Sequence, residues 1–218
     1  MAKNILMCLL LVAGAPLVDA QSVSAQIPPD EAIPGQFDAG DRIHWFTRHS
    51  FGLGSQFTSL AVAGIATGHN TPEEYGPHWE GFGKRYGLAV SHHVISGGLE
   101  AGFGSLWGED PRYFRVPERS IGARLFNVVK MTVVTHNSQG REMPAYARFI
   151  AIPSTAFMAN AWLPDSDNRP SDAASRIGIA FSGRLMGNAA REFWPDLRRH
   201  LPHRQTKSSD PDTLSSLR

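Results

Sequence analysis

The chain has 218 residues and a formal net charge of +1 at pH 7; 42% of its residues are hydrophobic and 19% are charged. A net charge this close to zero gives no electrostatic reason to expect a nucleic acid as a partner. The one cysteine, Cys8, lies in an N-terminal apolar run, so the rest of the chain must fold without a disulfide, and its length suits one domain.

Residues 1–20 are predicted to be a signal peptide. Lys3 precedes the apolar run 5–12, and the tripeptide 18–20 (VDA) places small residues where signal peptidase reads them. The run is shorter than the ~20 residues that a membrane span requires. Cleavage after this tripeptide, or at a second acceptable site after Ala25, predicts export to the bacterial periplasm or cell envelope, with membrane association left open.

The rest of the chain is predicted to be an all-α, glycine-rich helical bundle of about five helices. Residues 21–41 contain Pro and Gly among polar residues without a period and are expected to form a flexible linker. Helices are expected over 42–67, 78–107, 118–136, 144–163 and 171–200, which together form a helical domain over 42–200. Residues 201–218 are polar and Ser-rich, which is typical of a disordered tail.

The helix expected over 78–107 carries a stripe of small residues. Five of them project within ~100° of one another on a helix of 3.6 residues per turn: Gly83, Gly87, Ser91, Gly98 and Gly102. Because an interior glycine costs ~1 kcal/mol of helix propensity relative to alanine, we expect another helix to pack closely here. Gly183 and Gly187 make the last helix the expected neighbour. The alternative is that the glycines mark loops and breaks within a shorter helix.

Small residues four positions apart also occur in transmembrane helices, but this segment is not expected to insert by itself. The apolar side chains of 86–108 contribute about −3 kcal/mol of insertion free energy, and Glu100 alone would offset most of it. The composition therefore favours a compact envelope protein that touches a membrane.

Residues 109–115 (EDPRYFR) bring two acids, two arginines and two aromatic side chains into seven positions. Pro111 prevents the preceding helix from continuing, and Asp110 suits a turn. We expect a charged corner in which arginine pairs with carboxylate and Tyr113 and Phe114 are buried. Its residues are Glu109, Asp110, Arg112, Tyr113, Arg115 and the distant Glu192. The alternative interpretation of this segment is a ligand site.

Residues 81–87 (GFGKRYG) superficially resemble a phosphate-binding glycine loop. No strand precedes them and no Ser or Thr follows the lysine, as such a loop requires. A helix start with Lys84 and Arg85 in solvent is therefore expected. Contact with an anion or a lipid headgroup is the alternative.

An alternative polar site is formed by His92, His93 and Glu100. His93 and Glu100, seven residues apart, would share a helix face, whereas His92 would point ~100° away. With Asp110, these side chains are the candidates for a periplasmic enzyme, either a hydrolase or a lipid-modifying enzyme. The sequence contains no motif for a metal site, a nucleophile elbow or a cofactor, so none is expected.

Four sequence blocks occur in an order that resembles a family of uncharacterised exported bacterial envelope proteins. The blocks are GFGKRYG (81–87), EDPRYFR (109–115), WLPDSDNR (162–169) and EFWPD (192–196). The resemblance covers roughly residues 75–198 and implies a shared fold and an envelope location, but no known activity. Residues 137–146 depart from it because they are more charged.

These features together predict an exported helical protein with a structural or interaction role at or near a membrane. Its expected partner is a membrane or an envelope protein, and its oligomeric state is not defined by the sequence. An enzyme, the alternative, should bring polar groups together in a concave pocket. An interaction module should instead expose an apolar or aromatic patch.

Overall fold

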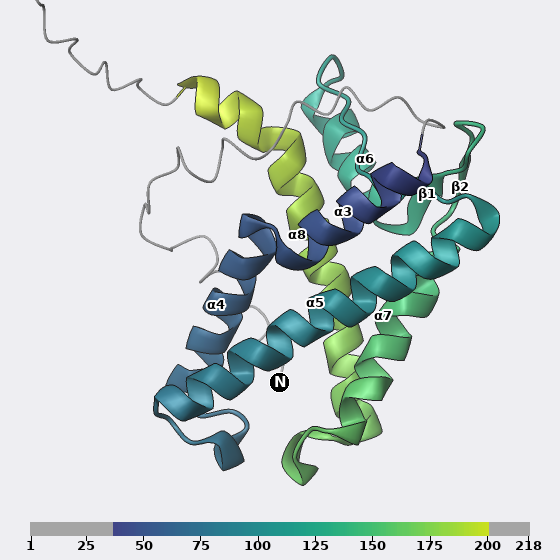
Figure 1. Cartoon of the computed structure of the whole chain (residues 1–218). Coiled ribbons are helices and arrows are strands. Elements are labelled where there is room, and N and C mark those ends of the chain that lie inside the picture. Colours follow the sequence, from purple (N-terminus) through teal and green to yellow (C-terminus); the bar gives the residue numbers. More distant parts are fainter. Residues whose placement is uncertain (1–36, 201–218) are drawn as a thin grey trace, which may run out of the picture.

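The computed structural model of the chain describes residues 37–200 and confirms the all-α prediction (Figure 1). The helices are α3 (Ala39–Phe51), α4 (Leu53–Gly68), α5 (Trp79–Trp107), α6 (Ile121–Val133), α7 (Tyr146–Met158) and α8 (Pro170–His200). Short 3-10 helices cover Glu73–Tyr75 (η1), Ala159–Ala161 (η2) and Asp165–Asp167 (η3), and strands β1 (Val134–His136) and β2 (Glu142–Pro144) form a small hairpin. The predicted signal peptide, residues 21–36 of the predicted linker and the predicted tail lie outside the described residues.

The first expected helix, 42–67, is present as α3 and α4, which meet at Gly52. The backbone of Gly52 is extended (ψ 157°), and a Cβ added there would lie 2.3 Å from the carbonyl oxygen of Arg48. A glycine is therefore required at this bend. α3 also begins earlier than expected, because Asp38 and Asp41 form a reciprocal capping box. The predicted linker therefore ends at Asp38, not at residue 41.

Two expected helices are shorter than predicted at their C-termini. α6 ends at Val133, because the next three residues pair with β2 in an antiparallel register that sets Thr135 opposite Met143. The run of β-branched residues at 133–135 favours this extended backbone. α7 ends at Met158 and is followed by one 3-10 turn, η2.

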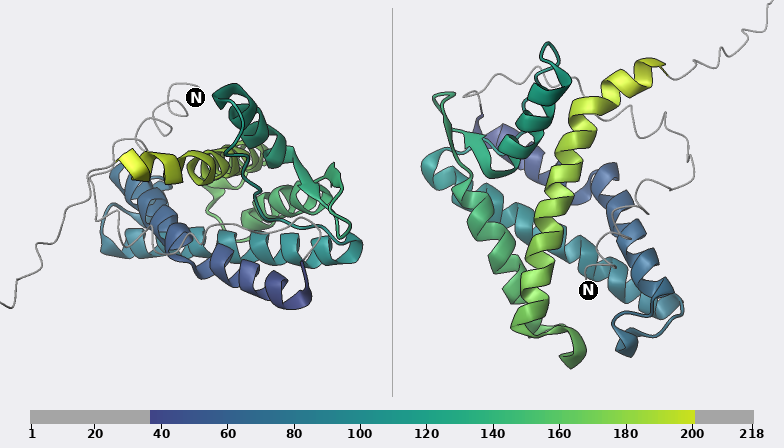
Figure 2. Two further views of the ribbon diagram at one scale, coloured as in Figure 1. Left: turned by 90° about the horizontal axis from the view of Figure 1, so that it is seen from above. Right: turned by 180° about the vertical axis from the view of Figure 1, so that it is seen from behind.

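α5 and α8 are the two long helices that organise the fold. α5 packs against α3, α4 and α7, and α8 packs against α6 and α7. Figures 1 and 2 show α4 and α7 on opposite sides of α8. Each of the shorter helices therefore touches a long one, and each keeps a large part of its surface on the outside.

The interior is filled largely by small and polar side chains. Fully buried alanines come from α4, α7 and α8: Ala63, Ala147, Ala151, Ala156 and Ala173. Larger apolar groups form one cluster around Tyr113, Val128 and Met131, with Phe114 and Phe193 packed against it. Buried ion pairs occupy much of the remaining interior, so side-chain hydrogen bonds join the helices as much as apolar packing does.

The predicted packing of the glycine stripe is wrong. A Cβ added at Gly83, Gly87, Gly102, Gly183 or Gly187 would meet no atom within 4 Å, and at Gly98 it would reach only ordinary contact with Phe46. Ser91 is exposed. The alternative of a broken helix is also wrong, because α5 is continuous over 29 residues.

Different glycines of α5 make the close contacts. A Cβ at Gly97 would lie 2.7 Å from the His49 ring, and one at Gly104 would lie 3.0 Å from Arg42 Nη1. Both neighbours belong to α3. The packed face is therefore rotated from the predicted stripe by about one residue, or ~100°, and it faces α3 instead of α8.

Candidate functional site

The corner after α5 contains a bidentate ion pair between Asp110 and Arg112. Arg112 Nη2 lies 2.7 Å from Asp110 Oδ2, and Arg112 Nε lies 2.9 Å from Asp110 Oδ1. The backbone N–H of Asp110 donates to the carbonyl of His136 at 2.9 Å. The fully buried Asp110 therefore ties the corner to β1.

Glu192 of α8 has no exposed surface and accepts hydrogen bonds from two other segments. Its carboxylate accepts from Tyr113 Oη and from Arg124 Nε, both at 2.8 Å. Arg115 donates instead to the main-chain carbonyl of Glu192, at 2.9 Å. Burial and the neighbouring Glu192 carboxylate raise the pKa of the Tyr113 hydroxyl. The structure thus brings together Tyr113, Arg115 and Glu192, and adds Arg124 of α6, which no sequence pattern had indicated.

Glu109 has a different role from the predicted one. Its carboxylate accepts from the backbone N–H of Ala147 at 3.1 and 3.2 Å, and also from the Trp107 indole. It therefore caps the N-terminus of α7, where the helix dipole favours an anion. Burial raises the pKa of Glu109. The corner as a whole joins α5, β1, α6, α7 and α8.

Glu100 of the alternative polar site lies in a buried ionic cluster. Its Oε1 accepts from Arg148 Nε of α7 at 3.1 Å and from Arg184 Nη2 of α8. Arg148 also donates to the carbonyls of Met131 and Thr132 at 3.0 and 2.9 Å. Burial alone would raise the pKa of Glu100, but the charges of Arg184 and Arg148 lower it below its usual value. Glu100 is therefore an ionised structural anchor and not a free acid or base.

The two histidines of this site lie in different surroundings. His93 lies edge-to-face with His49 of α3, with ring centroids 6.0 Å apart. Burial lowers the pKa of His92 to about 4, with help from the charges of His93 and Arg176. Among residues 37–200, no group of three or more His, Cys, Asp or Glu side chains is placed to hold a metal ion.

The half-buried His49 makes stability depend on pH. Burial lowers the pKa of His49 to about 3, and the charges of Arg184, His93 and Arg191 act in the same direction while Glu100 opposes them. Between pH 6.5 and about 3 the unfolded chain binds a proton that the folded chain does not, so stability rises with pH in this window.

We therefore expect the free energy of unfolding to fall as the pH drops below 6.5, by up to about 1.4 kcal/mol per pH unit from His49. His49→Gln should flatten this slope in urea unfolding curves measured from pH 7 to pH 4. His44→Gln, at an exposed histidine of the same helix, is the matched control. An unchanged slope in His49→Gln would contradict the assignment.

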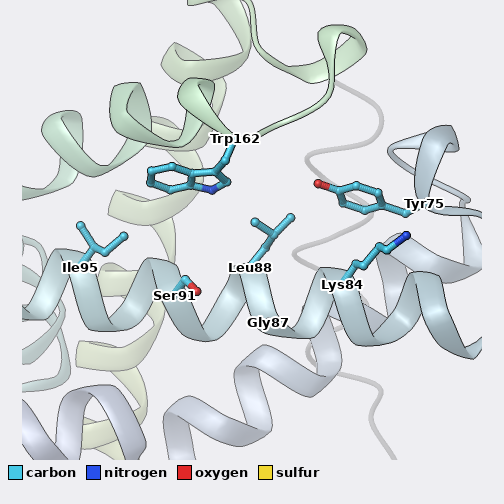
Figure 3. Close-up of a pocket in the computed structure, with 7 residues that line it drawn as sticks. All are labelled: Tyr75, Lys84, Gly87, Leu88, Ser91, Ile95 and Trp162. Atoms are coloured by element: carbon cyan, nitrogen blue, oxygen red, sulfur yellow. The ribbon is translucent and has the colours of Figure 1, made fainter.

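A hollow of about 500 Å³ lies along one side of α5. Its walls are mainly apolar, and α5 forms its floor while Tyr75 of η1 and Trp162 lie across from the helix (Figure 3). Neither the charged corner nor His92, His93 or Glu100 lines it. The polar groups proposed for catalysis therefore do not converge in this hollow.

The outer surface of α6 is apolar, and its inner surface carries both polar and apolar side chains. The buried positions are Arg124, Asn127 and Thr132, together with Val128 and Met131 of the apolar cluster. The exposed large side chains are all hydrophobic: Ile121, Leu125, Phe126, Val129 and Val133. Ile121 is 70% exposed and Phe126 is 68% exposed. A helix that faces water normally carries polar side chains on its outer surface, so the apolar outer face of α6 is unusual.

α7 and α4 also expose large apolar side chains. In α7, Phe149, Ile150 and Phe157 are exposed, whereas the buried positions are mostly small or polar, with Ile152 the one larger apolar residue among them. In α4, the buried positions are small (Ser59 and Ala63), and the exposed large side chains are Leu53, Phe57, Leu60 and Val62. Large apolar side chains are therefore exposed on several sides of the molecule.

Within residues 37–200, no helix is both long enough and apolar enough to cross a bilayer.

The chain matches no family model, no curated protein and no solved structure. The resemblance to exported envelope proteins therefore stays a prediction.

Proposed function

We propose that this protein is exported to the bacterial cell envelope and binds a membrane through the apolar outer faces of its helices, in a structural or interaction role. The apolar outer face of α6 is the observation that carries this proposal. Five large apolar side chains are exposed on it, and the buried face beneath holds Arg124, Asn127 and Thr132 beside Val128 and Met131. A lipid environment favours this arrangement, whereas water does not.

The energetics of this face favour an apolar environment. Full burial of a Val, Leu, Ile or Phe side chain contributes about 1.5–3 kcal/mol. The five exposed side chains of α6 are already partly covered, so roughly half of that sum remains available, or about 4–7 kcal/mol. No charged residue belongs to this exposed set, and the Lys130 ammonium is paired with Glu142 at 2.6 Å. A desolvation penalty from charge is therefore small.

The enzyme alternative has no specific support among the described side chains. Glu100 is held by two arginines, Asp110 by Arg112, and His93 stacks edge-on against another histidine. These contacts hold the helices together, and the groups do not share a concave site. The exposed apolar faces instead meet the criterion for an interaction module.

The proposal predicts that a charge placed on the outer face of α6 weakens membrane binding. Phe126→Glu should lower binding to phosphatidylcholine vesicles about tenfold or more, because a tenfold change corresponds to about 1.4 kcal/mol and a buried Phe contributes more than that. Vesicle flotation measures the bound fraction, and uncharged headgroups keep electrostatic attraction out of the comparison.

Gln139→Glu is the matched control, because it adds the same charge at an exposed position of the hairpin between β1 and β2. It should float like the parent. The proposal fails if the parent protein does not float, or if Phe126→Glu and the parent float equally. Extraction of the envelope fraction with carbonate and with detergent tests the location independently.

A further inference from the structure

The charged side chains are divided between the two ends of the molecule. α8 runs from one end to the other and, with 31 residues, is about 46 Å long. Figure 1 shows its start at the lower end and its last turns at the upper end, where α6 also lies. The net charge of the chain is only +1, so attraction to a charged surface depends on this division.

The lower end is acidic. Its carboxylates belong to η1, η3 and the first turn of α8: Glu73, Glu74, Asp165, Asp167 and Asp172. Ser166 Oγ donates to Glu74 Oε2 at 2.9 Å, which joins η3 to η1. Arg169 is an exposed cation among these acids, and Arg176 Nη1 lies 3.5 Å from Asp167 Oδ1. Carboxylates therefore outnumber cations here.

The other cations near this end add little surface charge. Lys84 Nζ lies 2.7 Å from Glu80 Oε1, and Arg85 is buried. The Arg85 guanidinium donates to three main-chain carbonyl oxygens, each at 2.7 Å: those of Thr71, Pro72 and Gly76. These contacts correct the expectation that Arg85 lies in solvent.

The upper end, where α6 meets the last turns of α8, is rich in arginine. Arg124 Nε lies 2.8 Å from Glu192 Oε1, and both Arg124 and Arg115 contact Asp196. The hydrogen bond from Arg124 lowers the pKa of Asp196, and the charges of Arg115 and Arg199 act in the same direction. One partly exposed carboxylate, Asp196, therefore faces three arginines.

Three arginines at this end are exposed: Arg119, Arg198 and Arg199, with Glu118 the exposed carboxylate beside them. Arg198 and Arg199 lie in the last turn of α8, where a cation complements the helix dipole. Arg119 instead lies directly before Ser120, the N-cap of α6, where the dipole disfavours a cation. Helix stability therefore explains two of these arginines but not Arg119, whereas an anionic surface outside the protein would favour all three.

These arginines border the apolar outer face of α6. Arg119 is two residues before Ile121, which is 70% exposed, and Leu197, which is 55% exposed, directly precedes the two arginines of α8. Val116 N donates to Glu192 Oε2 at 3.4 Å, which holds the segment before α6 against α8. Exposed apolar side chains beside basic ones are typical of proteins that bind the surface of anionic bilayers.

We propose that the membrane bound by α6 is an anionic phospholipid bilayer, and that the protein docks with Arg119, Arg198 and Arg199 at the headgroups and its acidic end directed away. This inference rests on the proposed function and adds the class of lipid and the orientation. Each basic side chain at an anionic bilayer raises affinity about fivefold, so three give up to about 100-fold, less the opposing effect of Glu118 and Asp196. The acids of the far end lie beyond the Debye length of about 10 Å in 0.1 M salt.

Vesicle flotation with and without phosphatidylglycerol tests the lipid class. Phosphatidylcholine vesicles measure the apolar contribution of α6, and vesicles that contain one third phosphatidylglycerol add the charge. In 0.1 M salt the parent protein should bind the anionic vesicles at least tenfold more tightly, and this gain should disappear in 1 M salt, where the Debye length is about 3 Å.

The outcomes separate this inference from the proposed function. Flotation on phosphatidylcholine without a gain from phosphatidylglycerol would overturn the lipid class and leave the proposed function standing. Flotation on neither vesicle would overturn both. Flotation on the anionic vesicles alone would contradict the apolar contribution of α6 and support the lipid class.

Arginine variants test which residues provide the charge. Arg119→Gln should lower affinity for the anionic vesicles about fivefold and leave binding to phosphatidylcholine unchanged. Arg169→Gln, which removes the same charge at the acidic end, is the matched control and should not weaken binding. Combined replacement of Arg119, Arg198 and Arg199 by Gln should remove most of the gain. A combined variant that keeps the gain of the parent would show that these arginines do not face the membrane.

Two labelled positions of α8 test the orientation. Leu197→Cys and Ser171→Cys, each in a chain with Cys8→Ser, place an environment-sensitive fluorophore at exposed positions near opposite ends of the helix. On anionic vesicles, the label at position 197 should shift to shorter wavelength and be quenched by spin-labelled lipid, whereas the label at position 171 should emit as in buffer. Equal emission changes at both positions, or a change at position 171 alone, would contradict the docking orientation.

Discussion

Replacement of Glu192 by alanine should destabilise the protein by about 3–5 kcal/mol, the range for removing one partner of a buried ion pair. Glu192 has no exposed surface, and Arg124 would lose the carboxylate that faces its Nε at 2.8 Å. The Tyr113 hydroxyl would lose its acceptor as well. The free energy of unfolding from urea titration, followed by circular dichroism, measures the effect.

Asp196→Ala is the matched control for this prediction. Asp196 also contacts Arg124, but its side chain is 34% exposed, so its removal should cost about 1 kcal/mol or less. Tyr113→Phe should fall between the two, because it removes the hydroxyl that donates to Glu192 and accepts from Asn127, and keeps the ring. A Glu192→Ala protein that unfolds like the parent would show that the corner does not hold α6 and α8 together.

Glu100→Ala should produce a second loss of about 3–5 kcal/mol, because it leaves two arginines buried without their shared carboxylate. Arg148 lies 3.1 Å from Glu100, and Arg184 contacts the same oxygen from α8. Burial lowers the pKa of Arg184 to about 9, even with Glu100 present, so this guanidinium depends on a counter-charge. The same urea titration reports the change.

A second substitution tests the electrostatic cause. Arg184→Met in the Glu100→Ala background removes one unpaired charge and should recover part of the lost stability. Glu80→Ala, which breaks the exposed pair with Lys84, should change stability by less than about 1 kcal/mol. If Arg184→Met gives no recovery, an uncompensated charge is not the reason for the loss.

Local signals predicted the helices and several of their boundaries. Gly108 ends α5 in a left-handed conformation, with φ at +70°, and Pro111 follows within the corner. The acids and arginines of residues 109–115 were close enough in sequence to suggest the Asp110–Arg112 pair. The boundaries at Gly52 and at Val134 were missed because an interior glycine and a β-branched run are each compatible with a helix until a neighbouring element is known.

The glycine stripe shows where sequence reasoning about a site reached its limit. The period of α5 correctly predicts that small residues share one face of the helix. It does not say which face meets another helix. Gly97 and Gly104 contact α3, whereas Gly87 and its neighbours are open and line the hollow beside α5. A shift of one residue separates the packed face of α5 from its open face.

The sequence by itself determined that this chain is helical, that its helices are rich in glycine, and that an acidic and basic corner follows the long helix α5. These properties depend on hydrogen bonds and turns between residues that are close in the sequence, so the local sequence determines them. Only the tertiary structure decided that Arg124, Arg148 and Arg184 face inward while Phe126 faces outward. Which side of a helix is buried depends on the element that packs against it, and here the partners lie 48 to 84 residues away in the chain.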